Sequence, residues 1–243
     1  MKDTIGRIVT DEDKLMELKE RWNVGVNLIA ATDGGYGDNI GSSGVALLFE
    51  EDIVPIIKSN AKEKSKFDTI ESTREELLAM LSLEYILDFL AKMWGNPSEM
   101  VTLTIVTDSE SAKIEREKEG RTIGTRPMLA PNQEIKLELK ALEKRNRWID
   151  REVKWVESHL EGKNEGYAYY NELNRIADEL ATEAREEVLQ GRRKPGRHHI
   201  FPAARVGVKI RGQVVANKLT TIIKKTVGTE EIKKISEDKE WMG

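Results

Sequence analysis

Short apolar runs follow one another along the chain in a pattern that predicts β-strands. The first three are VGVNLIAAT (24–32), VALLFE (45–50) and IVPIIKS (53–59). Because these three runs lie close together in the sequence, we expect them to form an antiparallel meander. Two later runs, VTLTIVT (101–107) and VKWVES (153–158), predict a fourth and a fifth strand.

Helical periodicity occupies the intervals around the later strands. The segment 73–94 carries apolar residues around most of its circumference, which predicts a central buried helix. Amphipathic patterns predict further helices at 110–119, 132–147 and 170–189. The order β-β-β-α-β-α-β-α returns the later strands through helices, which favours parallel additions to the same sheet. We therefore predict an α/β fold with a mixed five-stranded sheet, three strands antiparallel and then two parallel, flanked by helices.

Changes in composition divide the chain into three parts. Residues 1–21 are highly charged and form a lead-in that is irregular or helical. Residues 22–189 hold all the strands and helices of the predicted α/β domain. Residues 190–243 form a basic C-terminal extension, which begins with the linker-like run RRKPGRHH.

One sign of charge dominates the C-terminal extension. Residues 188–229 include ten Lys or Arg and no Asp or Glu, so this segment carries +10 against −14 for the rest of the chain. Apolar residues alternate in 205–219, which predicts a β-hairpin with Arg211 and Gly212 at its turn, and a short amphipathic helix ends the chain. A cationic block of this length is typical of a polyanion-binding surface or of a solvated tail.

The composition excludes several kinds of functional site and bears on the expected cellular location. The chain has 243 residues, 39% of them hydrophobic and 34% charged, which is typical of a globular protein. It has no cysteine, which excludes disulfides, thiolate nucleophiles and zinc ribbons, and its three histidines are too few for a multi-histidine metal cage. Because it has neither a signal-peptide core nor a bilayer-spanning run, we expect an intracellular protein, cytoplasmic or nuclear, with no membrane partner.

Acidic residues at the ends of apolar strands are the first candidates for chemistry. The glycine-rich stretch 33–44, which predicts a loop after the first strand, lacks the G-x-G-x-x-G spacing and precedes a strand, so it does not predict a dinucleotide site. Asp33 follows the strand 24–32 and Asp108 follows the strand 101–107, where α/β proteins collect ligands. For each of them, a turn or a helix N-cap is the structural alternative.

Two helices carry further carboxylates. Glu75 and Glu76 open the buried helix, and each completes a capping-box pattern with Ser72 or Thr73, so a capping role is the structural alternative for one of the two. In the last helix Asp178 lies one turn after an asparagine, on the flank of the apolar stripe. A carboxylate at the edge of a core is costly unless it is paired or binds a metal.

Five short motifs follow one another along the chain; they are ATDGG (31–35), STREELLA (72–79), IVTDSESA (105–112), KWVESH (154–159) and NRIADELATEA (174–184). Their order resembles that of the type 1 ribonuclease H family, in particular the ribonuclease H domains of retroelement polyproteins. Together they cover about residues 24–189, and each falls on the element type that the family has there. The resemblance implies a ribonuclease H-like fold.

The resemblance also implies an activity and its residues. The metal-binding carboxylates of the family fall on Asp33, Glu76, Asp108 and Asp178, where the R-x-E-L motif selects Glu76, and its loop histidine falls on His159. The implied reaction is hydrolysis of the RNA strand of an RNA–DNA hybrid with two Mg²⁺ ions, for which Mn²⁺ can substitute. Two Mg²⁺ ions among hard oxygen ligands suit phosphodiester hydrolysis.

Substrate contacts are expected on both sides of the carboxylates. The backbone of Gly34 and Gly35 leaves room for close approach of the duplex, and the resemblance adds Asn174. The basic residues after the last helix are further candidates; they are Arg192, Arg193 and Arg197. The expected partners are an RNA–DNA hybrid and other domains of a polyprotein. Two alternatives stay open: a related two-metal DNA nuclease of the resolvase or integrase kind, and a nucleic-acid-binding module without catalysis.

Overall fold

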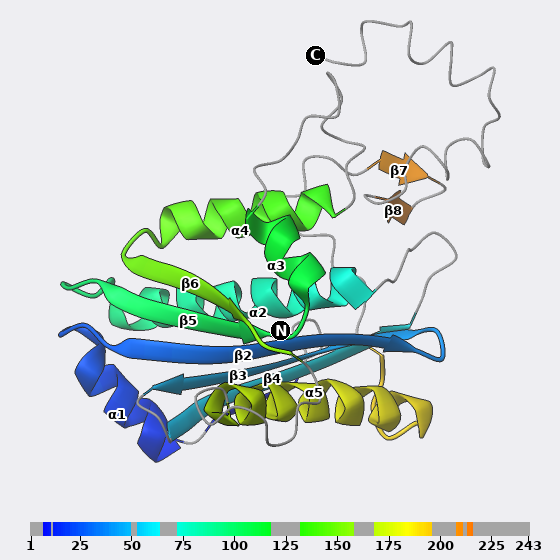
Figure 1. Cartoon of the computed structure of the whole chain (residues 1–243), viewed down its shortest axis with the longest axis horizontal. Helices are drawn as coiled ribbons and strands as arrows, with labels where there is room; N and C mark the ends of the chain where they lie inside the picture. Colours follow the sequence, from blue (N-terminus) through cyan, green and yellow to red (C-terminus); the bar gives the residue numbers. More distant parts are fainter. Residues whose placement is uncertain are drawn as a thin grey trace, which may run out of the picture.

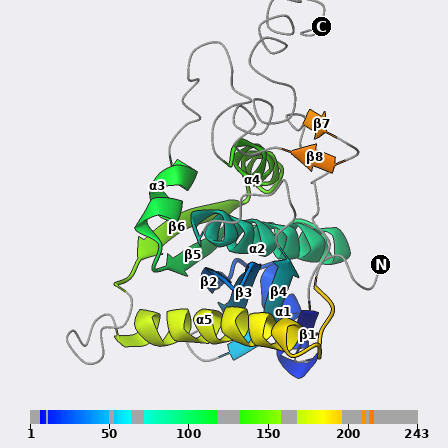
Figure 2. The same cartoon turned by 90° about the vertical axis from the view of Figure 1, so that its right-hand side faces the viewer.

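The protein folds as an α/β sandwich in which helices cover both faces of one mixed sheet (Figures 1 and 2). The computed structural model describes residues 7–10, 12–49, 53–63, 72–117, 132–157, 168–195, 208–210 and 213–215. The strands are β1 (Arg7–Thr10), β2 (Asn27–Gly37), β3 (Ile40–Phe49), β4 (Ile53–Glu63), β5 (Val101–Thr107) and β6 (Ile149–Trp155). The helices are α1 (Glu12–Trp22), α2 (Ser72–Trp94), α3 (Glu110–Glu117), α4 (Gln133–Arg145) and α5 (Ala168–Leu189).

The sheet has the strand order β1-β4-β3-β2-β5-β6. Strands β2, β3 and β4 form the predicted antiparallel meander, and β5 and β6 add in parallel on the other side of β2. The α/β class and the split into antiparallel and parallel strands are confirmed. The predicted number of five strands was wrong, because β1 pairs antiparallel with β4 and makes a sixth.

Helix α1, which lies largely within the predicted N-terminal lead-in, packs into the core of the sheet domain. In α1, Leu18 and Trp22 are fully buried in the main hydrophobic cluster, and Leu15 packs against that cluster. The indole of Trp22 donates a hydrogen bond to the carbonyl of Gly95 at 2.9 Å. These three apolar residues recur at helical spacing within a highly charged segment. The predicted boundary at residue 22 therefore falls on the last residue of α1, a helix that packs into the core.

The glycine-rich stretch 33–44, predicted as a loop, is almost entirely strand. Strands β2 and β3 continue as a hairpin whose turn residues, Asp38 and Asn39, have φ values of 52° and 61°. Positive φ at both positions is typical of the tight turns that match the twist of a hairpin. Asp33 thus lies inside β2 instead of after its end. The stretch lacks the usual apolar pattern because two helices pack against its glycines.

The two faces of β2 contact different helices. Leu28 and Ala30 belong to the core cluster shared with α2, whereas Ala31 packs with Leu173 and Ala177 of α5. Successive side chains of a strand point to opposite faces, so odd-numbered positions of β2 face α5 and even-numbered positions face α2. Helix α4 packs against α2, outside the layer that α2 forms on the sheet.

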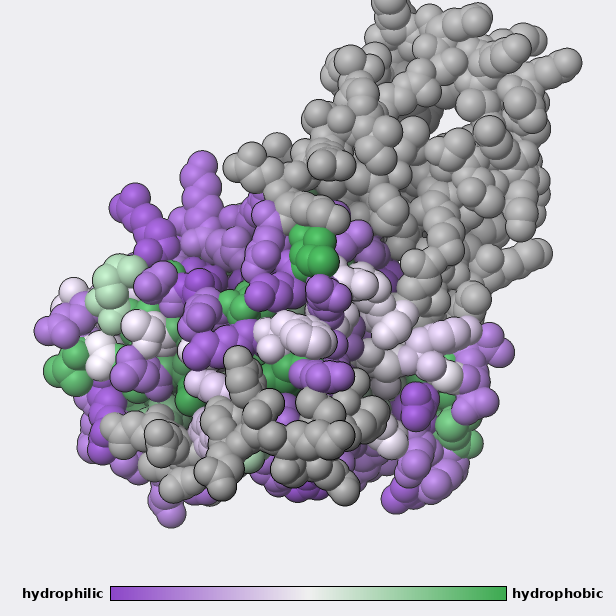
Figure 3. Space-filling model, viewed as in Figure 1, coloured by the Kyte–Doolittle hydropathy of each residue, from purple (hydrophilic) through white to green (hydrophobic). Residues whose placement is uncertain are grey.

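The remaining predictions concern the extension and the surface. Strands β7 (Val208–Ile210) and β8 (Gln213–Val215) pair antiparallel, which confirms the predicted hairpin, whereas the predicted terminal helix lies outside the described residues. The described surface in Figure 3 is largely hydrophilic, with scattered hydrophobic residues. None of the described helices is long and apolar enough to cross a membrane.

Candidate metal centre

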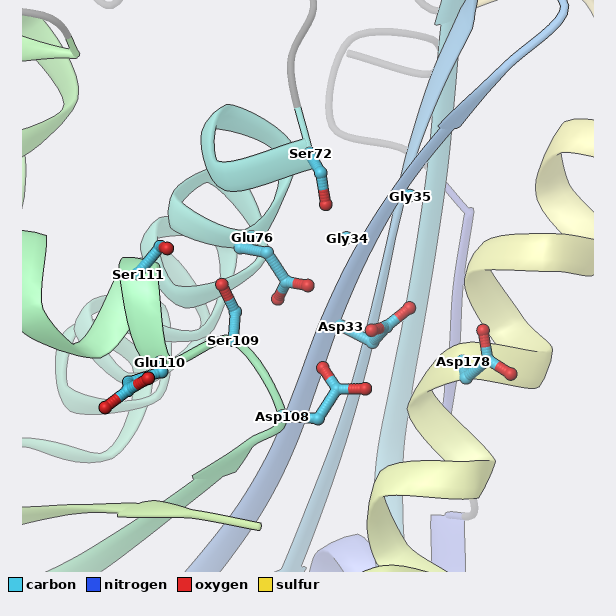
Figure 4. A pocket seen from close by; sticks show the side chains of 10 residues that line it. All are labelled: Asp33, Gly34, Gly35, Ser72, Glu76, Asp108, Ser109, Glu110, Ser111 and Asp178. Carbon is cyan, nitrogen blue, oxygen red and sulfur yellow. The ribbon is translucent and has the colours of Figure 1, made fainter. Parts of the chain in front are cut away.

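Four carboxylates from four different elements meet at one pocket. Asp33 comes from β2, Glu76 from α2, Asp108 from the residue after β5 and Asp178 from α5, and all four line the pocket. Oxygens of the first three lie within 4.8 Å of one another, and Asp178 faces Asp33 from the side of α5 (Figure 4). The structure thus brings together all four carboxylates singled out in the sequence.

The parallel pairing of β2 with β5 places two of these carboxylates side by side. Ala31 of β2 pairs with Val106 of β5, and Asp33 and Asp108 each follow two residues later in the sequence. Neighbouring strands lie about 4.8 Å apart, and residues two apart point to the same face. Asp33 is only 7% exposed, whereas Asp108 is partly exposed at the rim.

A close approach of α2 to β2 positions Glu76. A Cβ atom added to Gly34 would lie 2.2 Å from the backbone nitrogen of Glu76 and 2.2 Å from the carbonyl carbon of Glu75. No side chain fits there, so glycine at position 34 allows the first turn of α2 to rest on the strand. Glu76 then lies at the pocket and is 3% exposed, whereas Glu75 is buried outside the cluster of three.

A second glycine positions Asp178. Gly44 of β3 pairs with Asp33, so both positions face α5. A Cβ atom at Gly44 would lie 2.1 Å from the carbonyl oxygen of Ala177 and 3.0 Å from the nitrogen of Ala181. Helix α5 therefore contacts the bare backbone of β3, and this contact brings the exposed Asp178 to the edge of the pocket.

The helix N-cap, which was the structural alternative for Asp108, is supplied by its neighbour Ser109. The Ser109 side chain caps α3 by accepting a hydrogen bond from the Ala112 backbone nitrogen at 3.2 Å. The backbone carbonyl of Asp108 accepts a hydrogen bond from the Trp155 indole at 2.9 Å, which ties the end of β5 to β6. Since Ser109 supplies the cap, the carboxylate of Asp108 faces the pocket instead (Figure 4).

Burial and mutual repulsion disfavour negative charge at the centre of the cluster. Burial raises the pKa of Asp33 to about 7, and the carboxylates of Asp108 and Asp178 add to this effect. Burial likewise raises the pKa of Glu76 well above its ordinary value, with Asp33 and Asp108 as further causes. The Gly34 backbone opposes both shifts through hydrogen bonds, and so does the Thr107 side chain for Glu76.

These residues fit a divalent cation. One carboxylate oxygen of Glu76, Oε2, is buried and has no hydrogen-bond partner, which is costly without a cation or a proton. Carboxylate oxygens are the ligands that Mg²⁺ and Mn²⁺ prefer. A bound cation would stabilise the ionised forms of Asp33 and Glu76, because its charge opposes the repulsion that raises their pKa values.

Of the other predicted site residues, some line the pocket, some lie away from it and some are outside the described residues. Gly34 and Gly35 line the pocket. Asn174 is buried one turn before Asp178, and its Oδ1 has no hydrogen-bond partner. Arg192 is exposed after the end of α5, and Arg193 lies 3.6 Å from Glu187 in an ion pair. His159 and Arg197 lie outside the described residues.

Thr107 and Ser109 were not predicted as site residues. Thr107 is fully buried, and its hydroxyl group takes part in a hydrogen bond with Glu76 while its Oγ1 accepts one from the Ser109 nitrogen at 3.2 Å. Both residues flank Asp108 in the T-D-S motif. Their position beside a candidate ligand was the available signal, since polar neighbours often orient metal ligands.

Comparison with known proteins finds similarity among solved structures alone. No protein-family model matches the sequence, and no curated protein matches it. The chain is similar to the N-terminal RNase H domain of Rv2228c from Mycobacterium tuberculosis, solved as a fusion with maltose-binding protein, at 16% identity and a TM-score of 0.46, over 70% of this chain and 100% of that one. It is similar to LC11-RNase H1 in complex with an RNA/DNA hybrid, at 18% identity and a TM-score of 0.45, over 67% and 99% of the two chains.

A third similar structure is the protease–reverse transcriptase of prototype foamy virus, at 15% identity and a TM-score of 0.45, over 65% of this chain and 20% of that one. The similar structures thus include RNase H1 domains and a retroviral protease–reverse transcriptase. Identities this low assign neither an activity nor a substrate to the present chain.

Proposed function

We propose that this protein is a metal-dependent endonuclease that hydrolyses the RNA strand of RNA–DNA hybrids. The observation that carries the proposal is the convergence of Asp33, Glu76, Asp108 and Asp178 on one open pocket, three of them with oxygens within 4.8 Å of one another. Each comes from a different element, so the whole fold is needed to assemble them. The five motifs that resemble type 1 ribonucleases H supply the substrate class.

The carboxylates would hold two Mg²⁺ ions. Such a pair of ions activates the attacking water and neutralises charge on the leaving oxygen of a phosphodiester. Asp33 lies between Asp108 and Asp178 (Figure 4), and both raise its pKa, so Asp33 would be the central ligand of the ions. Thr107 and the Gly34 backbone hold the oxygens of Glu76 and Asp33 in place by hydrogen bonds.

Several residues would contact or serve the substrate. Asn174 and the strand backbone at Gly34 and Gly35 would meet the hybrid beside the pocket, where contacts to the 2′-hydroxyl groups distinguish RNA from DNA. His159 would assist proton transfer or product release. These roles follow from the resemblance and from the position of the glycines on the pocket wall.

We assign catalysis to residues 22–189 and duplex binding to the basic extension 190–243. The ten cationic residues in 188–229 follow directly on the helix that carries Asp178. An acidic pocket repels phosphates until cations bind, so a neighbouring cationic segment would hold the duplex. Within the described part of this segment, β7 and β8 pair as a short antiparallel hairpin.

A substrate panel tests the proposal. The full chain is incubated with Mg²⁺ and end-labelled RNA–DNA hybrid, duplex DNA, duplex RNA or single-stranded RNA, and Asp108→Asn is the matched inactive control. We expect cleavage of the RNA strand of the hybrid by the wild type alone. Cleavage of duplex DNA in preference to the hybrid would identify a DNA nuclease instead, and tight binding without any cleavage would identify a binding module.

A further inference from the structure

An arginine on α5 lies on the bare backbone of β2 next to the carboxylate pocket. If Cβ atoms were added to Gly35 and Gly37, they would lie 3.6 Å and 3.3 Å from Nη1 of Arg185. Helix α5 runs alongside β2 in the same direction (Figure 1), so residues after Asp178 on the helix lie near residues after Asp33 on the strand.

The alternation of β2 explains why the guanidinium can lie there. Asp33, Gly35 and Gly37 are the odd-numbered positions, which face α5. Two glycines in a row on this face leave a strip of backbone without side chains. A Cβ at Gly37 would already be in tight contact with the guanidinium, so larger side chains at these positions would displace Arg185 from the strand.

The ion pairing of Arg185 differs from that of Arg175 on the same helix. Within the part of the chain that the structure describes, no carboxylate forms an ion pair with Arg185, although its side chain is partly buried. Arg175 on the same helix, by contrast, pairs with Glu172 and Glu179. A partly buried guanidinium without an acidic partner has lost some hydration without compensation, so an external anion is its natural partner. Its planar donors match the oxygens of a phosphate.

The spacing fits a phosphate that flanks the scissile one. Arg185 follows Asp178 by seven residues, which is about 10 Å along a helix. A phosphate at Arg185 would therefore lie on the same strand as the phosphate at the carboxylates and close to it. Gly35, which lines the pocket, lies between the two sites.

We propose that Arg185 binds a backbone phosphate of the nucleic-acid strand close to the one held at the carboxylates. This inference rests on the proposed nuclease function and adds a positioning residue to it. Arg185 does not contact the reacting atoms. It fixes the register of the strand across the pocket, because the same strand must meet the acidic cluster and the guanidinium at once.

Hybrid binding at several salt concentrations tests this role. The full chain with Asp108→Asn, which prevents cleavage, is compared with and without Arg185→Gln, Arg185→Lys and the control Arg175→Gln. We expect Arg185→Gln to weaken binding about tenfold and to lower the slope of log affinity against log salt by about 0.9. Arg185→Lys keeps the charge, so it keeps the slope while losing part of the affinity. Arg175→Gln changes neither.

Kinetics of the otherwise wild-type chain separate positioning from a general loss of structure. Arg185→Gln is expected to raise KM for the hybrid while kcat and the thermal midpoint of unfolding stay close to those of the wild type. Affinity and salt slope equal to those of Arg175→Gln would overturn the role of Arg185 while cleavage by the wild type upholds the nuclease. Absence of cleavage by the wild type in any substrate, with an Arg185-dependent salt slope retained, would instead overturn the nuclease function and uphold the phosphate contact.

Discussion

Asp33 is expected to destabilise the metal-free protein at neutral and alkaline pH. Burial, Asp108 and Asp178 raise its pKa to about 7 from an ordinary value of 3.8. Between these two pH values the folded state holds a proton that the unfolded state has already lost. The free energy of unfolding therefore falls as the pH rises through this window and levels off above pH 7.

The size of the effect follows from the two pKa values. One pKa unit corresponds to 1.36 kcal/mol, so the shift of Asp33 is worth on the order of 4 kcal/mol. Asparagine has nearly the same volume and no charge. We therefore expect Asp33→Asn to be more stable than the wild type at pH 8 by up to about 4 kcal/mol, and equally stable near pH 4.

Urea denaturation in the presence of EDTA, at pH values from 4 to 9, measures this difference. Parallel pH profiles for the wild type and Asp33→Asn would refute the reasoning, and so would a less stable variant at pH 8. Adding Mg²⁺ at pH 8 supplies a second readout. Saturating cation stabilises the state that binds it, by about 2.7 kcal/mol at 100 times the dissociation constant, and Asp33→Asn should lose most of this gain.

Three further changes test other parts of the structure. Gly34→Ala should lower the free energy of unfolding by about 3 kcal/mol or more, because the added Cβ meets the α2 backbone at 2.2 Å, whereas Gly35→Ala meets nothing closer than 3.5 Å and should be tolerated; equal urea midpoints for the two variants would contradict this packing. His159→Ala should slow hybrid cleavage by about 10²–10⁴-fold without ending it, and an unchanged steady-state rate from pH 6 to 9 would remove the histidine from the reaction. Deleting residues 191–243 should raise KM for the hybrid and flatten its salt dependence while leaving the metal requirement intact, and an unchanged salt slope would point to docking as the role of the extension.

The sequence predicted the carboxylates of the site because each lies beside an element with a clear apolar pattern. Strand 101–107 was predicted with the bounds of β5, and Asp108 follows it directly. The helix that carries Glu76 and the helix that carries Asp178 also lie within two residues of their predicted limits. Long periodic segments of this kind are specified by local patterns, so the elements could be placed without the tertiary structure.

Features that depend on contacts between distant segments were not predictable. Gly34 and Gly44 read as loop residues in the sequence, although their bare backbones are the surfaces on which α2 and α5 rest. Strand β1 has only four residues, and its pairing with β4 has no local signal. Glu84 is fully buried within the apolar helix α2, where it forms ion pairs with Arg116 and Arg151.

The rate of hybrid cleavage at saturating Mg²⁺, compared between the wild type and Asp33→Asn, tests the central claim most directly. Loss of an ion-binding carboxylate removes several kcal/mol of transition-state stabilisation. The cleavage rate should therefore fall by a factor of about 10³ or more. We expect Mg²⁺-dependent cleavage of the RNA strand by the wild type and a loss of at least this size in the variant, which urea denaturation shows to be folded. Cleavage by a folded Asp33→Asn at a rate near that of the wild type, or cleavage by the wild type in EDTA, would contradict the assignment of the metal centre.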